Sequence, residues 1–133
     1  MPFYNSADQI YDCLQTVFNH VGAHNPNAGT ALLSLHLVTR MRLTAPAAQI
    51  TIDSRRRPIK TTYGPSPLRT DVEVEMAADT LHRILLGELL PKKAWANGLV
   101  KLRGPSWKTL VLADLFYQSQ AIYRQVLREQ GLM

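Results

Sequence analysis

The spacing of apolar residues along the chain changes from helical to alternating and then back to helical. Ile10, Leu14 and Val17 recur every three or four residues, which is the period of one face of an α-helix. Residues 6–9, Ser-Ala-Asp-Gln, precede this stripe with the spacing of a capping box. We therefore expect the first helix to cover about residues 7–21.

Four later segments alternate apolar and polar positions, which is the period of a β-strand with one buried face. The alternation is clearest where Val72, Val74 and Met76 are separated by Glu73 and Glu75. The turns between the segments are short, so the four strands are predicted to form an antiparallel meander. The predicted strands cover residues 33–45, 49–53, 58–63 and 70–76.

After the fourth strand the period becomes helical again. An apolar stripe at residues 81–85 predicts a helix that ends at Gly87, and the proline that begins residues 91–96 suits a second, short helix. Residues 99–103 predict a fifth strand. A last helix is expected from about residue 104 to residue 129.

This order of elements predicts an α+β fold. The five strands are expected to form a single, mostly antiparallel sheet with the helices packed on one face and a long helix at the C-terminus. A chain of 133 residues is long enough for one core and short for two. We therefore expect residues 1–133 to form a single domain.

The composition narrows the class of protein. Apolar residues make up 46% of the chain and charged residues 19%, as in an ordinary soluble domain. No apolar run approaches the ~20 residues that a membrane-spanning helix needs. Residues 1–5 lack the basic start and apolar core of a signal peptide, so the expected location is the cytoplasm.

The chain is basic, with a formal net charge of +5. This balance makes an anionic membrane surface a candidate partner. The dense run Arg55–Arg57, between two predicted strands, is typical of a solvated turn, and contact with a phosphate or lipid headgroup is the alternative. Nucleic acid is not favoured as a partner, because aromatic and basic residues are not interleaved as in base-stacking proteins.

The sequence offers no arrangement typical of an enzyme or a metal site. Cys13 is the single cysteine and has no catalytic signature around it. His20 and His24 are four residues apart, but Gly22 lies between them and no third ligand is near. His82 is expected on the polar side of its helix. We therefore predict no catalytic residue, no metal and no cofactor.

Three carboxylates share one face of the fourth predicted strand, namely Asp71, Glu73 and Glu75. A carboxylate cluster of this kind could hold a ligand. The favoured interpretation is a solvated outer face, or cross-strand pairing with Lys60 or Arg103.

The second half of the chain carries a recognisable order of motifs. Residues 71–76 form a strand, and residues 85–94 contain leucine, Gly87, a charged residue and leucine, followed by proline and alanine. Residues 97–104 contain a strand that starts after one glycine and ends at another. With the apolar helix that follows, residues 70–116 resemble the sterol-carrier-protein (nonspecific lipid-transfer protein) family.

This resemblance implies helices laid over one sheet face with an apolar tunnel between the two layers. It also implies non-catalytic binding or transfer of a fatty acyl, sterol or similar lipid. For any single apolar residue, ordinary core packing is the stronger interpretation, so the tunnel depends on the set as a whole. The residues available to line it are Leu81, Ile84, Leu85, Leu89, Leu90, Trp95, Leu99, Leu102, Leu110, Leu115 and Phe116.

A protein-interaction or dimerisation module without a ligand is the alternative function. The last helix, at ~25 residues, would be ~37 Å long, which is more than a chain of this size needs to cover its core. Tyr117 and Tyr123 are expected on its outer side, where they would contact a second copy of the chain. An elongated apolar cavity would favour the lipid carrier, and a filled interior would favour the homodimer.

Overall fold

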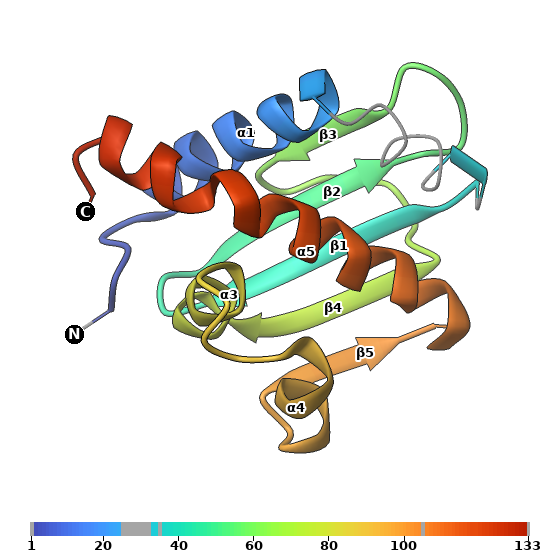
Figure 1. Ribbon diagram of the computed structural model, residues 1–133. Coiled ribbons are helices and arrows are strands. Elements are labelled where there is room, and N and C mark those ends of the chain that lie inside the picture. The colour runs from blue at the N-terminus through green and yellow to red at the C-terminus, as the bar shows by residue number, and fades with distance from the viewer. Residues whose placement is uncertain (1, 25–32, 35, 105, 133) are drawn as a thin grey trace.

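Figure 1 shows the computed structural model, in which a five-stranded sheet carries helices on one face. The structure describes residues 2–24, 33–34, 36–104 and 106–132, with the side chains of residue 24 and residues 106–115 left out. The elements, in chain order, are α1 (Ala7–His24), β1 (Val38–Thr44), β2 (Ala48–Asp53), β3 (Lys60–Tyr63), β4 (Val72–Ala77), α3 (Ala78–Leu85), α4 (Pro91–Ala96), β5 (Val100–Arg103) and α5 (Ser106–Glu129).

The predicted α+β fold with a long C-terminal helix is confirmed, with shifts at two boundaries. Helix α1 continues to His24, because Gly22 lies inside the helix and does not end it. The first strand begins at Val38, since Leu33 and Ser34 are helical. The alternation of apolar and polar residues at positions 33–37 therefore predicted a strand that begins five residues too early.

The strand order is β3-β2-β1-β4-β5, which makes the predicted four-strand meander wrong at its last strand. β1, β2 and β3 do form an antiparallel meander, and β4 pairs antiparallel with β5. The pair between β1 and β4, however, is parallel. The connection at residues 64–71 contains two prolines and crosses back over the sheet, whereas a hairpin would place β4 beside β3. The sheet is thus mixed, although most of its pairs are antiparallel.

The face of the sheet that meets the helices is apolar across all five strands. One row of side chains runs from Tyr63 through Ile50, Met41 and Val74 to Leu102. These residues belong to the core or pack against it. Because side chains alternate between faces, this register turns the apolar half of every strand toward the helices and buries it most fully in β1, β2 and β4.

The opposite face is polar and carries the carboxylates noted in the sequence. Glu73 Oε1 lies 3.7 Å from Arg40 Nη1 and 3.6 Å from Arg42 Nη2. Of the two cross-strand partners predicted from sequence, Arg103 does lie opposite a carboxylate of β4, whereas Lys60 does not, because β1 and not β3 lies beside β4. Lys60 is opposite Asp53 at the far edge, and Arg103 is opposite Glu73 on β5.

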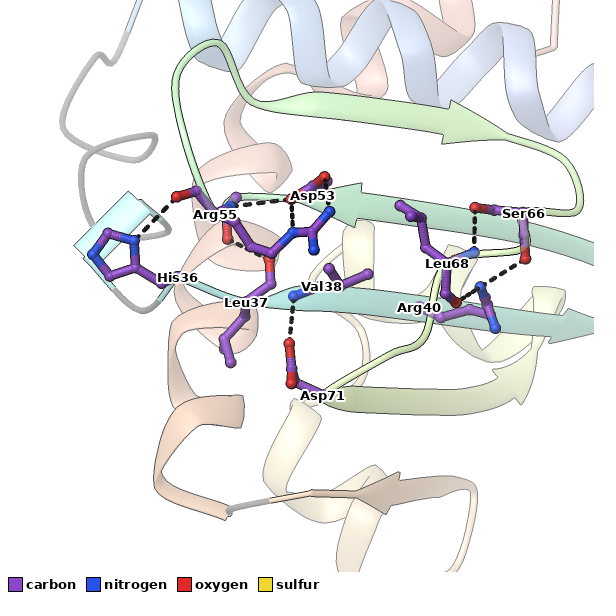
Figure 2. Close-up of polar contacts among 10 residues, drawn as sticks. His36, Leu37, Val38, Arg40, Asp53, Arg55, Ser66, Leu68 and Asp71 are labelled. Carbon is purple, nitrogen blue, oxygen red and sulfur yellow. Dashed lines mark hydrogen bonds and ion pairs between the residues drawn. The ribbon is translucent and has the colours of Figure 1, made fainter.

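The crossing segment, residues 64–71, is fastened to β1, as Figure 2 shows. Arg40 Nη2 donates to the carbonyl oxygens of Ser66, at 2.9 Å, and Leu68, at 2.8 Å. The Val38 N–H donates to Asp71 Oδ2 at 2.9 Å, and the Asp71 N–H donates to the Val38 carbonyl at 2.8 Å. Arg40 is buried, so these carbonyls and Glu73 satisfy a guanidinium that has little access to water.

The arginine run lies in the turn between β2 and β3, and Arg55, Arg56 and Arg57 are all exposed there, as predicted for a solvated turn. Arg55 donates from Nε and Nη2 to the two carboxylate oxygens of Asp53 at 3.0 and 2.9 Å. These hydrogen bonds lower the pKa of Asp53 to about 2. The pair is largely in water and belongs to the turn rather than to a site.

Candidate functional site

The predicted lining residues fall into three environments. Leu81, Ile84, Leu85 and Phe116 are buried, and the first three form the inner side of α3. Leu89 and Leu102 are half-buried against the core. Leu90, Trp95 and Leu99 are exposed around α4. Leu110 and Leu115 lie on α5, in the part of that helix whose side chains the structure does not describe.

The buried lining residues come together because α5 is fastened to the end of α3. Gln120 Nε2 donates to the Ile84 carbonyl at 2.8 Å, and Arg124 Nη2 donates to the Leu86 carbonyl at 3.2 Å. Both carbonyls lie near the C-terminal end of α3, where the helix leaves backbone acceptors without intrahelical partners. The α5 helix therefore holds the C-terminal end of α3.

The glycine that ends β5 has a steric reason to be there. A Cβ atom at Gly104 would lie 2.6 Å from the Asp71 carbonyl oxygen, and the backbone φ of Gly104 is +110°. Both conditions favour glycine over any other residue. The chain can therefore pass from β5 to α5 close to the start of β4.

A buried chain of hydroxyl groups lies where the N-terminal segment meets α1, α3 and α5. The hydroxyls of Tyr4 and Tyr123 are hydrogen-bonded to each other, and Tyr4 donates to Cys13 Sγ at 3.6 Å. The Tyr123 oxygen lies 2.7 Å from His82 Nδ1. Each hydroxyl has one proton, so if Tyr4 donates to Cys13, Tyr123 must donate to Tyr4 and His82 must donate from Nδ1.

Burial governs the protonation of this chain of hydroxyls. It raises the pKa of Tyr4 and of Tyr123 well above the ordinary value, and it raises the pKa of the Cys13 thiol. A protonated, fully buried thiol is a weak nucleophile. Cys13 therefore acts as a small core side chain that accepts a hydrogen bond.

His82, expected on the polar side of its helix, is half-buried between Phe3 and Tyr123. Its ring stacks on Phe3 with centroids 3.6 Å apart, and the Phe3 N–H donates to Asp79 Oδ1 at 2.9 Å. Burial lowers the pKa of His82, against the opposing effects of Asp79 and Glu88. The N-terminal residues that cover His82 lie ahead of the first helix, where periodicity carries no information.

Tyr123 is fully buried, which overturns the prediction that it faces outward from the last helix. Only Tyr117, of the two tyrosines considered, lies on the exposed side of α5. A polar hydroxyl placed on an otherwise apolar stripe gives no sign of whether it points to water or to a buried partner. Its partner, Tyr4, is far away in the sequence.

A groove of about 550 Å³ lies between α1 and the C-terminal end of α5. Gln130 crosses it, donating from Nε2 to Thr16 Oγ1 at 3.0 Å and to the Asp12 carbonyl at 3.3 Å. Six of its seven lining residues are polar, which does not suit an acyl chain or a sterol. The lining residues are Gln9, Asp12, Gln15, Thr16, Asn19, Gln130 and Leu132.

In the part of the chain that the structure describes, no three His, Cys, Asp or Glu side chains lie together as a metal site would require. Within the same residues, no helix has the length and apolar character needed to cross a membrane.

Comparison with solved structures gives the fold independently. The sterol carrier protein domain 2 of Helicoverpa armigera is 17% identical, covers 84% of this chain and 88% of its own, and superposes with a TM-score of 0.67. Sterol carrier protein 2 of Yarrowia lipolytica, in its apo form, is 13% identical over 86% and 91%, with a TM-score of 0.63. Palmitated SCP2L2 of Aedes aegypti is 18% identical over 81% and 94%, with a TM-score of 0.60.

Comparison with curated proteins found no match. The sequence model of the SCP-2 sterol transfer family, by contrast, matches residues 18–117, which is most of the chain. This span begins well before residues 70–116, where motifs are visible by eye, and it includes the first three strands. The chain belongs to the SCP-2 sterol transfer family.

Proposed function

We propose that this protein binds an apolar lipid, of the fatty acyl or sterol class, and transfers or presents it without catalysing a reaction. The family match over residues 18–117 is the observation that carries the proposal. A relative with the same fold is described as palmitated, which supports a fatty acyl chain as one ligand. All of residues 1–133 would act as one lipid-binding unit.

The proposed site is a tunnel between the sheet and the helices on the side of α3, α4 and β5. Burial decreases steadily along this side, from Leu85 in the interior, through half-buried Leu89 and Leu102, to exposed Leu90 and Trp95. Such a gradient supports an apolar path from the core to the surface. Leu81, Ile84, Phe116, Leu99, Leu110 and Leu115 would complete the lining.

The free energy of binding an apolar ligand comes from burial and needs no catalytic group. Each methylene that leaves water for an apolar environment contributes ~0.8 kcal/mol, so a few buried methylenes give useful affinity. Residues 89–104 contain no Asp or Glu, so no carboxylate in this segment repels a fatty acid at the surface end of the path. The ligand's polar end would remain near α4, where lysines are available.

Uptake of a fluorescent fatty-acid analogue by delipidated protein tests the proposal. We expect saturable binding that unlabelled fatty acid displaces. Leu102→Trp places a larger side chain in the half-buried part of the path and should weaken uptake, whereas Tyr117→Trp, on the exposed side of α5, should not. Far-ultraviolet circular dichroism confirms that both variants fold. Absence of saturable uptake with fatty acids and with sterols alike would overturn the proposal.

A further inference from the structure

We propose that the corner formed by residues 90–103, here called the α4 corner, is a docking surface for membranes that contain anionic phospholipids. Trp95, Leu90 and Leu99 would enter the interfacial region of the bilayer, while Lys92 and Lys93 would contact lipid phosphates. This surface does not depend on whether a lipid occupies the interior. It concerns where the protein meets a membrane, not what it carries.

The α4 corner concentrates exposed apolar side chains. Leu90 is 52% exposed, Trp95 56% and Leu99 43%, and among the described residues the only other large apolar side chain so exposed is Tyr117 of α5. Single exposed apolar residues are common on protein surfaces. Three within ten residues, one of them tryptophan, are typical of an interaction surface.

The backbone holds these side chains outward. Ala94 is fully buried and fixes one side of α4 against the core, so Trp95, the next residue along the helix, points away from it. The Leu99 N–H donates to the Ala94 carbonyl at 2.9 Å, and the Gly98 N–H donates to the Trp95 carbonyl at 3.1 Å. Gly98, with φ of +77°, makes this tight turn, which returns the backbone of Leu99 to the end of α4.

The charge of the chain is also concentrated here. Residues 89–104 contain four basic residues and no acidic ones, whereas the whole chain has 15 basic and 10 acidic residues. Four of the five net positive charges therefore lie in this short segment. Lys101 and Arg103 are opposite Glu75 and Glu73 of β4, which offset them, so Lys92 and Lys93 are the cations left for an anionic surface.

Exposed apolar side chains next to lysines fit a bilayer better than a protein or a nucleic acid. Tryptophan favours the headgroup region of a membrane, and exposed lysines beside it add attraction to anionic lipids. β5 is an edge strand whose exposed Lys101 and Arg103 hinder pairing with another strand. Figure 1 shows α4 beyond β5, at the edge of the sheet opposite β3 and away from the chain termini, where it is free to meet a flat surface.

Vesicle flotation tests the docking surface. The full chain is mixed with vesicles of phosphatidylcholine alone or of phosphatidylcholine with phosphatidylserine. We expect binding to the anionic vesicles, about tenfold weaker binding for Lys92→Gln/Lys93→Gln, and little change for Arg56→Gln/Arg57→Gln, which removes two exposed charges from the β2–β3 turn. Equal loss in both double variants, or no binding to anionic vesicles, would overturn the proposal.

The apolar contact has its own readout. The chain has two tryptophans, Trp95 and Trp107. Fluorescence of the Trp107→Phe variant, in which Trp95 is the remaining tryptophan, should shift to shorter wavelength on vesicle binding, whereas fluorescence of Trp95→Phe should not, even though that variant still binds. Leu90→Ser/Leu99→Ser should weaken binding, whereas Tyr117→Ser should not. A shift that persists in Trp95→Phe, or displacement of the vesicles by a mixed-sequence oligonucleotide at low molar ratio, would overturn membrane docking through this corner.

Discussion

The two ends of the helical layer invert the usual distribution of polar and apolar groups. Where the N-terminal segment meets α1, α3 and α5, tyrosine hydroxyls lie inside the protein and are hydrogen-bonded to a half-buried imidazole. At the α4 corner, a tryptophan and two leucines lie outside it. The buried end is satisfied by hydrogen bonds that are complete within the chain, whereas the exposed end has large apolar surface left in water. The difference indicates that the first region serves the stability of the fold and the second serves contact with something else.

The largest expected effect is at the buried end and uses two tyrosines of α5. Tyr123 is 0% exposed and Tyr117 is 45% exposed. Tyr123→Ala should lower the free energy of unfolding by about 3–5 kcal/mol, because it leaves a cavity and removes hydrogen bonds. Tyr117→Ala should change it by about 0.5 kcal/mol or less. Urea denaturation measures both, and similar losses in the two variants would show that the buried tyrosine stabilises the fold no more than the exposed one.

A smaller change isolates the hydroxyl of Tyr123. Tyr123→Phe keeps the ring but leaves the Tyr4 hydroxyl and His82 Nδ1 each without this partner, so we expect a loss of about 1–3 kcal/mol in unfolding free energy. Tyr117→Phe is the matched control and should be neutral. A neutral effect at Tyr123 would mean that water replaces the lost hydroxyl.

Acidification should lower the stability of the folded protein through His82. The pKa of His82 is lower in the folded protein than its ordinary value of 6.5, so the unfolded chain binds the proton more readily. Its contribution to stability is therefore complete above pH 6.5 and is lost as the pH falls toward the folded pKa. Thermal midpoints measured across this range should fall less in His82→Gln than in the wild type. Parallel curves for the two proteins would exclude His82 as the source.

The smallest effect on stability is expected at the α4 corner. Trp95→Gln should change the unfolding free energy by about 0.5 kcal/mol or less, because the side chain is mostly in water already. The same variant should be less prone to self-association, which light scattering detects. A large loss of stability would show that Trp95 is a core residue and would remove the distinction between the two ends.

Periodicity predicted the elements well and their pairing less well. Alternation identified which face of β4 is apolar, but nothing in a local pattern states that β4 lies beside β1. Tyr4 and Tyr123, which are hydrogen-bonded, are 119 residues apart in the sequence. The partial burial of His82 was not predicted for the same reason, since Phe3 and Tyr123 reach it from both ends of the chain.

The candidate site was predictable where helices are long enough to have a period. Leu81, Ile84 and Leu85 are buried, as their spacing on α3 implies. Leu90, Trp95 and Leu99 surround a helix of six residues, which is too short for periodicity to separate an inner side from an outer one. The lining of a tunnel, the homodimer and the cytoplasmic location all stay predictions.

The crossing segment held by Arg40 has a consequence for how this fold can vary. It divides the sheet into a three-strand unit, β1 to β3, and a two-strand unit, β4 and β5, that meet along a single parallel pair. Insertions or deletions between α3 and β5 would therefore alter the second unit alone. A change in the length or chemistry of the α4 region would leave the three-strand unit, and the joint between the two units, with their hydrogen bonds.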